Sequence, residues 1–168
     1  FTRGMAFAAF NRIVESLAGV YLDALDGKRH ETEKSEVLLE ASYMAGVAFS
    51  NSGLGIVHGI AHPLGTYFGV PHGLVCAVCL PLAIELNREA MGPAYALLSQ
   101  SIGGDLLERI KGLLTAMEIP AVFRSKPMDH RDDIINYVLG SGSTAMNPKT
   151  IDRNDVVWML ERLFVESS

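Results

Sequence analysis

The chain has 168 residues, a mildly acidic net charge of -5 and two cysteines, Cys76 and Cys79. This length is enough for one domain or two very small ones, and enough to close a sizeable core. The acidic balance argues against a nucleic-acid-binding surface, and two cysteines are too few for a disulfide scaffold and favour a reducing, cytoplasmic setting. No unbroken apolar run approaches the roughly 20 residues that cross a bilayer, so no membrane span is expected.

Apolar residues recur at helical spacing along most of the chain, and no segment of useful length alternates with a period of two. Loops or turns are predicted at 28–36, 65–70 and 141–149. The first predicted helices are 5–25, 32–49 with Thr32 as its N-cap, and 54–64, which should be fully buried. They are followed by 72–87, with Pro71 at its start and a kink at Pro81, and by 93–102. Three more helices are predicted: one capped by Asp105 and ended by Pro120, one that begins at Asp129, and a last one that runs through Phe164 and is capped by Asp152 or Asn154. This pattern predicts an all-α, multi-helix bundle of roughly seven to nine helices.

The stretch 53–81, GLGIVHGIAHPLGTYFGVPHGLVCAVCLP, holds three of the five histidines, His58, His62 and His72. It lies within a run, 41–84, that contains no Asp, Glu, Lys or Arg. A neutral imidazole in so apolar a segment needs a hydrogen-bond partner or a metal ion. His58 and His62 share a helical face at spacing i, i+4, and the Gly/Pro turn allows His72 to fold back toward them. The pattern indicates a candidate site for Zn, Fe, Co or Ni.

Other interpretations of these residues stay open. Each histidine could be a hydrogen-bonded core residue, a helix cap or a proton relay. His72, Cys76 and Cys79 could line one helical face as a zinc site, although a lone C-x2-C in an apolar helix is more often two buried thiols. The two other histidines, His30 and His130, stand among charged residues and are predicted to be exposed.

The stretch 53–81 resembles the metal-binding signature of the iron-containing (group III) alcohol dehydrogenases, G-L-G-x-x-H-x-x-x-H-P-L-G followed by P-H-G and L-P. The lactaldehyde reductase and propanediol dehydrogenase branch is the most similar, and the glycerol dehydrogenase and dehydroquinate synthase branches fit less well. The segment 41–55 and N-P-K at 147–149 extend the resemblance over nearly the whole chain. It implies that residues 1–168 are a single helical metal-binding domain, the dehydroquinate synthase-like C-terminal domain of that family.

The resemblance also implies residue roles. His58 and His72 match two metal-ligand positions, and His62 matches a histidine beside the metal and near the nicotinamide, where it would serve catalysis by positioning or proton transfer. The implied cofactors are Fe(II), which Zn can replace, and NAD(P). The implied role of the metal is to polarise the oxygen of a small alcohol or aldehyde substrate for hydride transfer.

The chain departs from the family pattern in one respect. Two further family ligands belong to a D-A-x-x-H-A-x-E segment that is absent here, and Asp26 and His30 copy its D-x3-H spacing only within a polar connection. No G-x-G-x-x-G follows a predicted strand. We therefore expect the N-terminal α/β cofactor domain to lie outside this chain. With two ligands, the chain alone should hold metal weakly or not at all and be inactive.

Two more expectations follow from the missing domain. The face near His58, His62 and Phe68 would be left exposed and apolar, and should drive formation of a homo-oligomer. The alternative to an enzyme fragment is a non-catalytic all-α interaction or metal-binding module whose histidines are structural.

Overall fold

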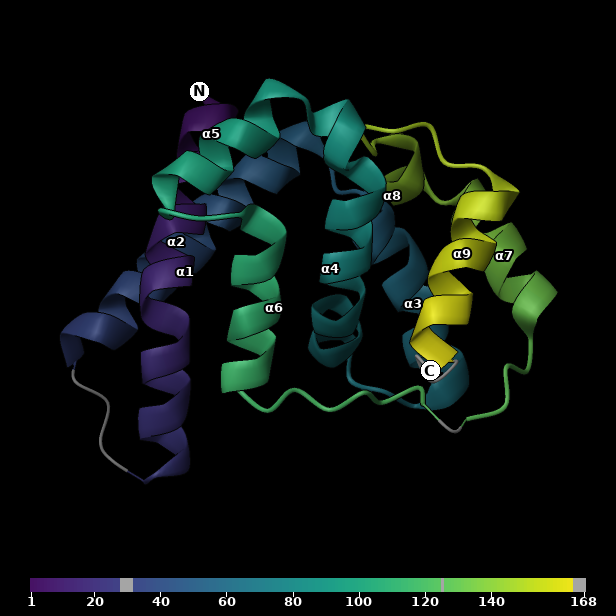
Figure 1. The fold of residues 1–168 in the computed structure, drawn as a ribbon, viewed down its shortest axis with the longest axis horizontal. Helices are drawn as coiled ribbons and strands as arrows, with labels where there is room; N and C mark the ends of the chain where they lie inside the picture. The colour runs from purple at the N-terminus through teal and green to yellow at the C-terminus, as the bar shows by residue number, and fades with distance from the viewer. Residues whose placement is uncertain (28–31, 125, 165–168) are drawn as a thin grey trace. The chain divides into compact units, whose positions relative to one another are not determined.

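The computed structural model describes residues 1–27, 32–124 and 126–164. These residues form helices and no strand (Figure 1), which confirms the predicted all-α fold class. None of the described helices is long and apolar enough to span a membrane. The helices are α1 (Thr2–Leu25), α2 (Thr32–Ser52), α3 (Ile56–Phe68), α4 (His72–Met91), α5 (Pro93–Ser101), α6 (Leu106–Ala116), α7 (Arg131–Gly140), α8 (Gly142–Ala145) and α9 (Arg153–Phe164).

The chain divides into two compact units. The first contains Phe1–Gly53 and Ala94–Glu118, and the second contains Leu54–Pro93 and Ile119–Ser168. All three histidines of the predicted site therefore belong to the second unit. The assignment of residues 1–168 to a single domain stays a prediction.

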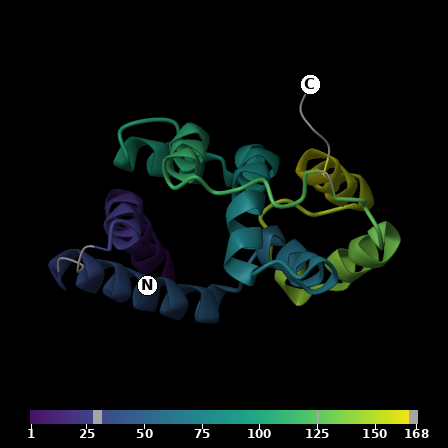
Figure 2. The same cartoon turned by 90° about the horizontal axis from the view of Figure 1, so that it is seen from below.

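In the first unit, α1 and α2 run side by side, as Figures 1 and 2 both show, and α6 packs against α1. The small residues Ala9 and Ala41 are almost fully buried. Asp105 accepts the N–H of Glu108 at 3.2 Å and caps α6, as predicted. The predicted end of the first helix is confirmed by Gly27, whose φ of +65° is the left-handed conformation that glycine favours after a helix.

The second unit builds its core between α3, α4, α7 and α9. The aromatic rings of Phe68, Phe123 and Phe164 meet at centroid distances of 5.1 to 5.8 Å. Phe68 is partly buried and packs against this core, so it is less exposed than predicted for a face beside the histidines. The fully buried aliphatic side chains of the core are Ile56, Ile60, Leu64, Val75, Ile134, Ile135, Val138, Val156 and Leu160.

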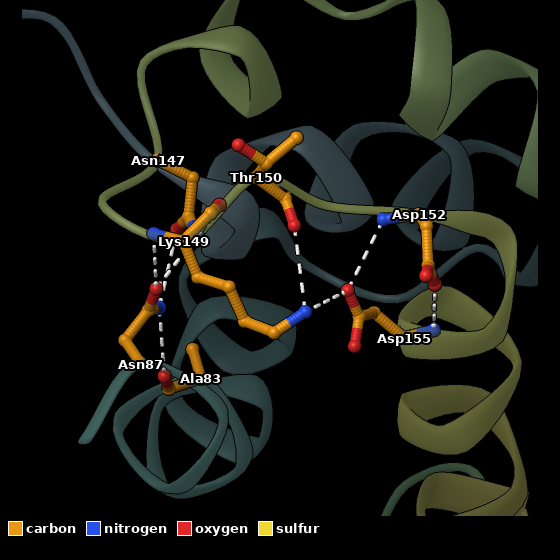
Figure 3. A network of polar contacts seen from close by, with 7 residues as sticks. All are labelled: Ala83, Asn87, Asn147, Lys149, Thr150, Asp152 and Asp155. Carbon is orange, nitrogen blue, oxygen red and sulfur yellow. Dashed lines mark hydrogen bonds and ion pairs between the residues drawn. The ribbon is translucent and has the colours of Figure 1, made fainter. Parts of the chain in front are cut away.

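A set of polar contacts, here called the asparagine junction, joins α3, α4 and the loop before α9 in the second unit (Figure 3). Asn147 Oδ1 accepts the N–H of Ile56 and an N–H of Asn87, both at 3.1 Å. Asn147 Nδ2 donates to Asn87 Oδ1 at 2.6 Å and to the carbonyl of Lys149 at 2.8 Å. Asn87 Nδ2 also donates to the carbonyl of Ala83 at 2.8 Å, and Asn87 Oδ1 accepts the N–H of Lys149 at 3.2 Å. Both side-chain amides therefore use all of their donors and acceptors.

The junction continues into the start of α9. Lys149 Nζ forms an ion pair with Asp155, and Asp155 Oδ2 accepts the N–H of Asp152 at 3.1 Å. In return, Asp152 Oδ1 accepts the N–H of Asp155 at 2.9 Å. Asp152 is therefore the cap of the last helix, one of the two residues predicted for that role. Figure 3 shows the lysine side chain reaching across to Asp155.

Two helix boundaries differ from the predictions because local breakers proved weaker than packing. Helix α2 continues to Ser52, where Asn51 and Ser52 bond back to carbonyls one turn earlier at 2.8 Å. Helix α3 runs through Pro63 to Phe68, so the predicted turn at 65–70 is wrong except at its end. Pro63 removes one hydrogen bond, and the helix instead ends at Gly69, whose φ is +64°.

The later boundaries differ by smaller amounts. Helix α4 passes through Pro81 and extends beyond Asn87 to Met91. Helix α7 begins at Arg131, because His130 has a φ of +59° and so stands outside the helix. The predicted loop 141–149 contains the four-residue helix α8.

Candidate metal centre

Helix α3 presents two histidines on the side that faces away from the core. Its first turn is held by Asn147, which accepts the N–H of Ile56, and Gly55 leaves room for this cap because a Cβ there would lie 3.0 Å from Asn147 Oδ1. The core side of the helix carries Ile56, Ile60 and Leu64. Helical periodicity then places His58 and His62 on the opposite face, one turn apart.

Helix α4 brings the third histidine and a thiol to the same place. Gly69 reverses the chain, and the Pro71 carbonyl accepts the N–H groups of Leu74 and Val75 at 3.0 and 3.1 Å. Pro71 is thus the N-cap of α4 rather than its first residue, and His72 opens the helix. Cys76 follows one turn later, half-buried, whereas Cys79 on the core side is fully buried.

The three imidazoles converge. Ring centroids lie 5.3 Å apart for His58 and His72, 5.1 Å for His62 and His72, and 6.4 Å for His58 and His62. Cys76 Sγ lies 3.4 Å from His72 Nε2. One possible ligand atom each from His58, His72 and Cys76 lies within 4.8 Å of the other two. The structure therefore brings together the three histidines that the sequence singled out as ligands or catalytic group.

The exposure of the site differs from the prediction. His62 and His72 are exposed and His58 is half-buried, so the segment is not a fully buried helix. Across residues 1–27, 32–124 and 126–164, no protein hydrogen bond engages the rings of His58 and His62.

The surroundings of His58 and Cys76 favour the neutral forms of these two side chains. Burial lowers the pKa of His58, and the neighbouring His72 and His62 lower it further. Its nitrogen lone pair is thus available to a metal at neutral pH. Burial raises the pKa of the Cys76 thiol, and raises that of Cys79 more strongly.

Two pockets of the second unit are lined in part by these side chains. A pocket of about 600 Å³ is lined by Ala61, His62, Gly65, Thr66, Val70, His72 and Tyr137. A second, mostly apolar pocket of about 360 Å³ is bordered by His58 and also by Asn87 and Asn147 of the asparagine junction. The histidine site therefore borders one pocket through His62 and His72 and the other through His58.

The donor set fits a divalent transition ion. Imidazole nitrogens and a thiolate are ligands that Zn, Fe and Co accept, and the donor atoms are near the spacing that one ion requires. The sequence suggested His72, Cys76 and Cys79 as one alternative zinc site, whereas the structure groups Cys76 with His58 and His72. The signal for this was the i, i+4 spacing of His72 and Cys76, but the partner from α3 could not be assigned without the fold.

The remaining candidate residues lie elsewhere. His130 is exposed, as predicted, and stacks on Tyr67 at a centroid distance of 4.5 Å. Asp26 is the residue that ends α1, and His30 lies outside the described residues. Of the predicted connection 28–36, residues 28–31 are outside the described part, and 32–36 belong to α2, so the connection is shorter than predicted. The predicted N-cap side chain of Thr32 is also outside the described part.

Comparison with known proteins gives one family. A sequence model described as "Fe-containing alcohol dehydrogenase family, C-terminal" matches residues 1–164. Lactaldehyde reductase of Escherichia coli (strain K12) is 35% identical over 92 residues, which are 55% of this chain and 23% of that protein. NADPH-dependent butanol dehydrogenase of Clostridium saccharobutylicum is 28% identical over 181 residues, covering 98% of this chain and 45% of that protein.

The same likeness holds in three dimensions. A crystal structure of 1,3-propanediol oxidoreductase matches with a TM-score of 0.86 at 23% identity, covering 97% of this chain and 45% of the other. At this identity the match shows a shared fold. The chain spans less than half the length of each of these three relatives.

Proposed function

This chain belongs to the iron-containing alcohol dehydrogenase family, as its C-terminal helical part, and from this premise we propose that it is the metal-bearing half of an NAD(P)-dependent alcohol dehydrogenase. Its substrates in that role are small alcohols and aldehydes. The observation that carries the proposal is the convergence of His58, His62 and His72 on one face, with ring centroids 5.1 to 6.4 Å apart.

In this proposal, His58 and His72 hold the metal, Fe(II) or Zn. When bound, such an ion supplies Lewis-acid chemistry at the substrate oxygen. The ring of His62 makes no protein hydrogen bond among the described residues, and it stacks on His72 at an interplanar angle of 17°. We assign His62 to positioning substrate and nicotinamide and to moving a proton at a ring nitrogen.

The open pocket beside His62 and His72 supports a small substrate. Val70 gives it apolar surface, and Thr66 and Tyr137 add hydroxyl groups. This mixture suits a short alkyl chain with an oxygen function. The remaining metal donors and the NAD(P) site are proposed to come from an N-terminal α/β domain outside this chain, so the chain alone should be inactive.

The alternative, a non-catalytic module with structural histidines, has an observation against it. A structural histidine normally donates or accepts a hydrogen bond to hold its neighbours in place. The rings of His58 and His62 make no such bond to any other residue within the described ranges.

The test is an NAD(P)-linked assay of the full-length gene product, supplied with Fe(II) or Zn, on short alcohols and diols. His58→Ala and His72→Ala should each abolish turnover, and the exposed, distant His130→Ala should keep it. The 168-residue chain assayed in parallel should show no turnover. Full activity of both site variants would refute the proposal.

Assembly and location complete the proposal. We expect a cytoplasmic protein that forms a homo-oligomer. Light scattering on the 168-residue chain that shows a monomer at high concentration would contradict the expected homo-oligomer.

A further inference from the structure

We propose that Cys76 is a third metal ligand, so that this chain offers two imidazole nitrogens and one sulfur, from His58, His72 and Cys76, and prefers Zn(II) or Co(II). The inference rests on the proposed function, because it uses the same two imidazoles. It goes further in naming a ligand and a metal preference that come from this chain alone.

The first support is distance. With a metal–sulfur bond of about 2.3 Å and a metal–nitrogen bond of about 2.05 Å, tetrahedral donors lie about 3.6 Å apart. The separation of Cys76 Sγ and His72 Nε2 is 3.4 Å, close to that spacing. The widest donor pair of the cluster, within 4.8 Å, needs to close by only about an ångström, which small side-chain rotations at exposed and half-buried positions allow.

The second support is the way in which α4 is built. His72 and Cys76 stand one turn apart on its first two turns, so the helix backbone places both side chains near His58 of α3. Cys79, three residues further on, is fully buried and belongs to the core. The two cysteines of the C-x2-C motif thus have different roles, and only one is within reach of an ion.

The chemistry balances without a further reactant. On binding, the thiol of Cys76 releases one proton to solvent and its sulfur donates a lone pair to the ion, with no change of oxidation state. A thiolate is a soft ligand that favours zinc and cobalt over manganese and magnesium. Three ligands with an open fourth position is also the arrangement of catalytic zinc sites. The chain alone should then hold metal more tightly than two imidazoles predict.

The experiment is a titration of the metal-free 168-residue chain with Co(II), followed by absorbance. The wild-type chain should show tetrahedral visible bands together with a thiolate-to-cobalt charge-transfer band in the near ultraviolet. Cys76→Ala should lose the charge-transfer band and bind about 100-fold more weakly, because a site divides its binding free energy among its donors. The matched control, Cys79→Ala, should keep both the band and the affinity.

A second measurement covers the case in which Cys76→Ala fails to fold. In Cys79→Ala, Cys76 is the only thiol of the chain. Its reaction with a thiol reagent should slow at least about tenfold when Zn(II) is added, and His72→Ala should abolish this protection. Equal reactivity with and without Zn(II) would overturn the proposal.

The outcomes separate this inference from the proposed function. Co(II) bound by wild type and Cys76→Ala with equal affinity and no charge-transfer band would refute the third ligand and leave His58 and His72 as ligands. No Co(II) binding by the wild-type chain would also refute the inference. The dehydrogenase proposal would then still be decided by the assay of the full-length protein.

Discussion

The two polar clusters of the second unit, the histidine site and the asparagine junction, use the same two helices in opposite ways. At the junction, Asn87 and Asn147 satisfy every donor and acceptor of their side-chain amides with other protein groups. At the histidine site, the donors of His58, His72 and Cys76 point at one another, with a single thiol–imidazole contact between them. A satisfied polar cluster stabilises a fold, whereas donors left facing one another indicate a ligand from outside the chain.

The largest effect is expected from a substitution that disrupts the asparagine junction. Asn147→Ala removes the cap of α3 and leaves Asn87, which is only 6% exposed, without two of its side-chain hydrogen bonds. The free energy of unfolding should fall by about 3 kcal/mol, since buried polar groups lose their hydrogen bonds. Urea unfolding measures it. Asn154→Ala, at an exposed asparagine of α9, should change it by less than about 0.5 kcal/mol, and equal effects of the two variants would contradict the special role of Asn147.

The next effect concerns the histidine site. Zn(II) at about 100 times its dissociation constant should raise the free energy of unfolding of the wild-type chain by about 2.7 kcal/mol. His58→Ala and His72→Ala should lose most of this gain, and His130→Ala should keep it. The measurement is thermal unfolding with and without Zn(II). If Zn(II) stabilised all three variants as much as the wild-type chain, the ion would bind elsewhere.

A smaller effect tests the contact between α3 and α8. A Cβ at Gly59 would lie 2.0 Å from Thr144 Oγ1 in α8, so Gly59→Ala should destabilise the fold by about 2 kcal/mol through overpacking. Thr144→Ala removes the obstructing oxygen, which is buried without a partner. The double variant should therefore recover most of the loss. If the two effects simply add, the helices are not in contact there.

The smallest expected effect on stability is that of His62→Ala. His62 is exposed, so the free energy of unfolding should change by less than about 0.5 kcal/mol. In the full-length enzyme the same change should lower kcat by about 100-fold or more, because a positioned acid–base group contributes that much. Loss of stability comparable to that of Asn147→Ala would instead make His62 structural and erase the contrast between the clusters.

The sequence was a good guide to local structure. Apolar spacing predicted the helices, and Asp105, Asp152 and Gly27 marked the ends where they were expected. The prediction that Pro63 would be followed by a turn was wrong, because packing of α3 outweighs the loss of one hydrogen bond. A helix-breaking residue makes a helix less stable, but it does not by itself determine where the helix ends.

What the sequence could not give was contact between distant residues. Asn87 and Asn147 are 60 positions apart, and neither has a local pattern that names the other. His58 and Cys76 meet only because α3 and α4 pack together, which local spacing does not reveal. Exposure of His62 and His72 depends on which helices cover α3, and that too is a property of the whole unit.

Helix α4 carries one residue of each cluster, His72 at its first position and Asn87 near its end. They are separated by fifteen residues, or about 22 Å along the axis. Each residue of a helix turns the chain by about 100°, so one amino acid gained or lost between them would swing one cluster away from its partners on the neighbouring elements. The length of this helix therefore fixes the relative placement of the two clusters. Substitutions along it can leave both clusters intact, but an insertion or deletion would disrupt one of them.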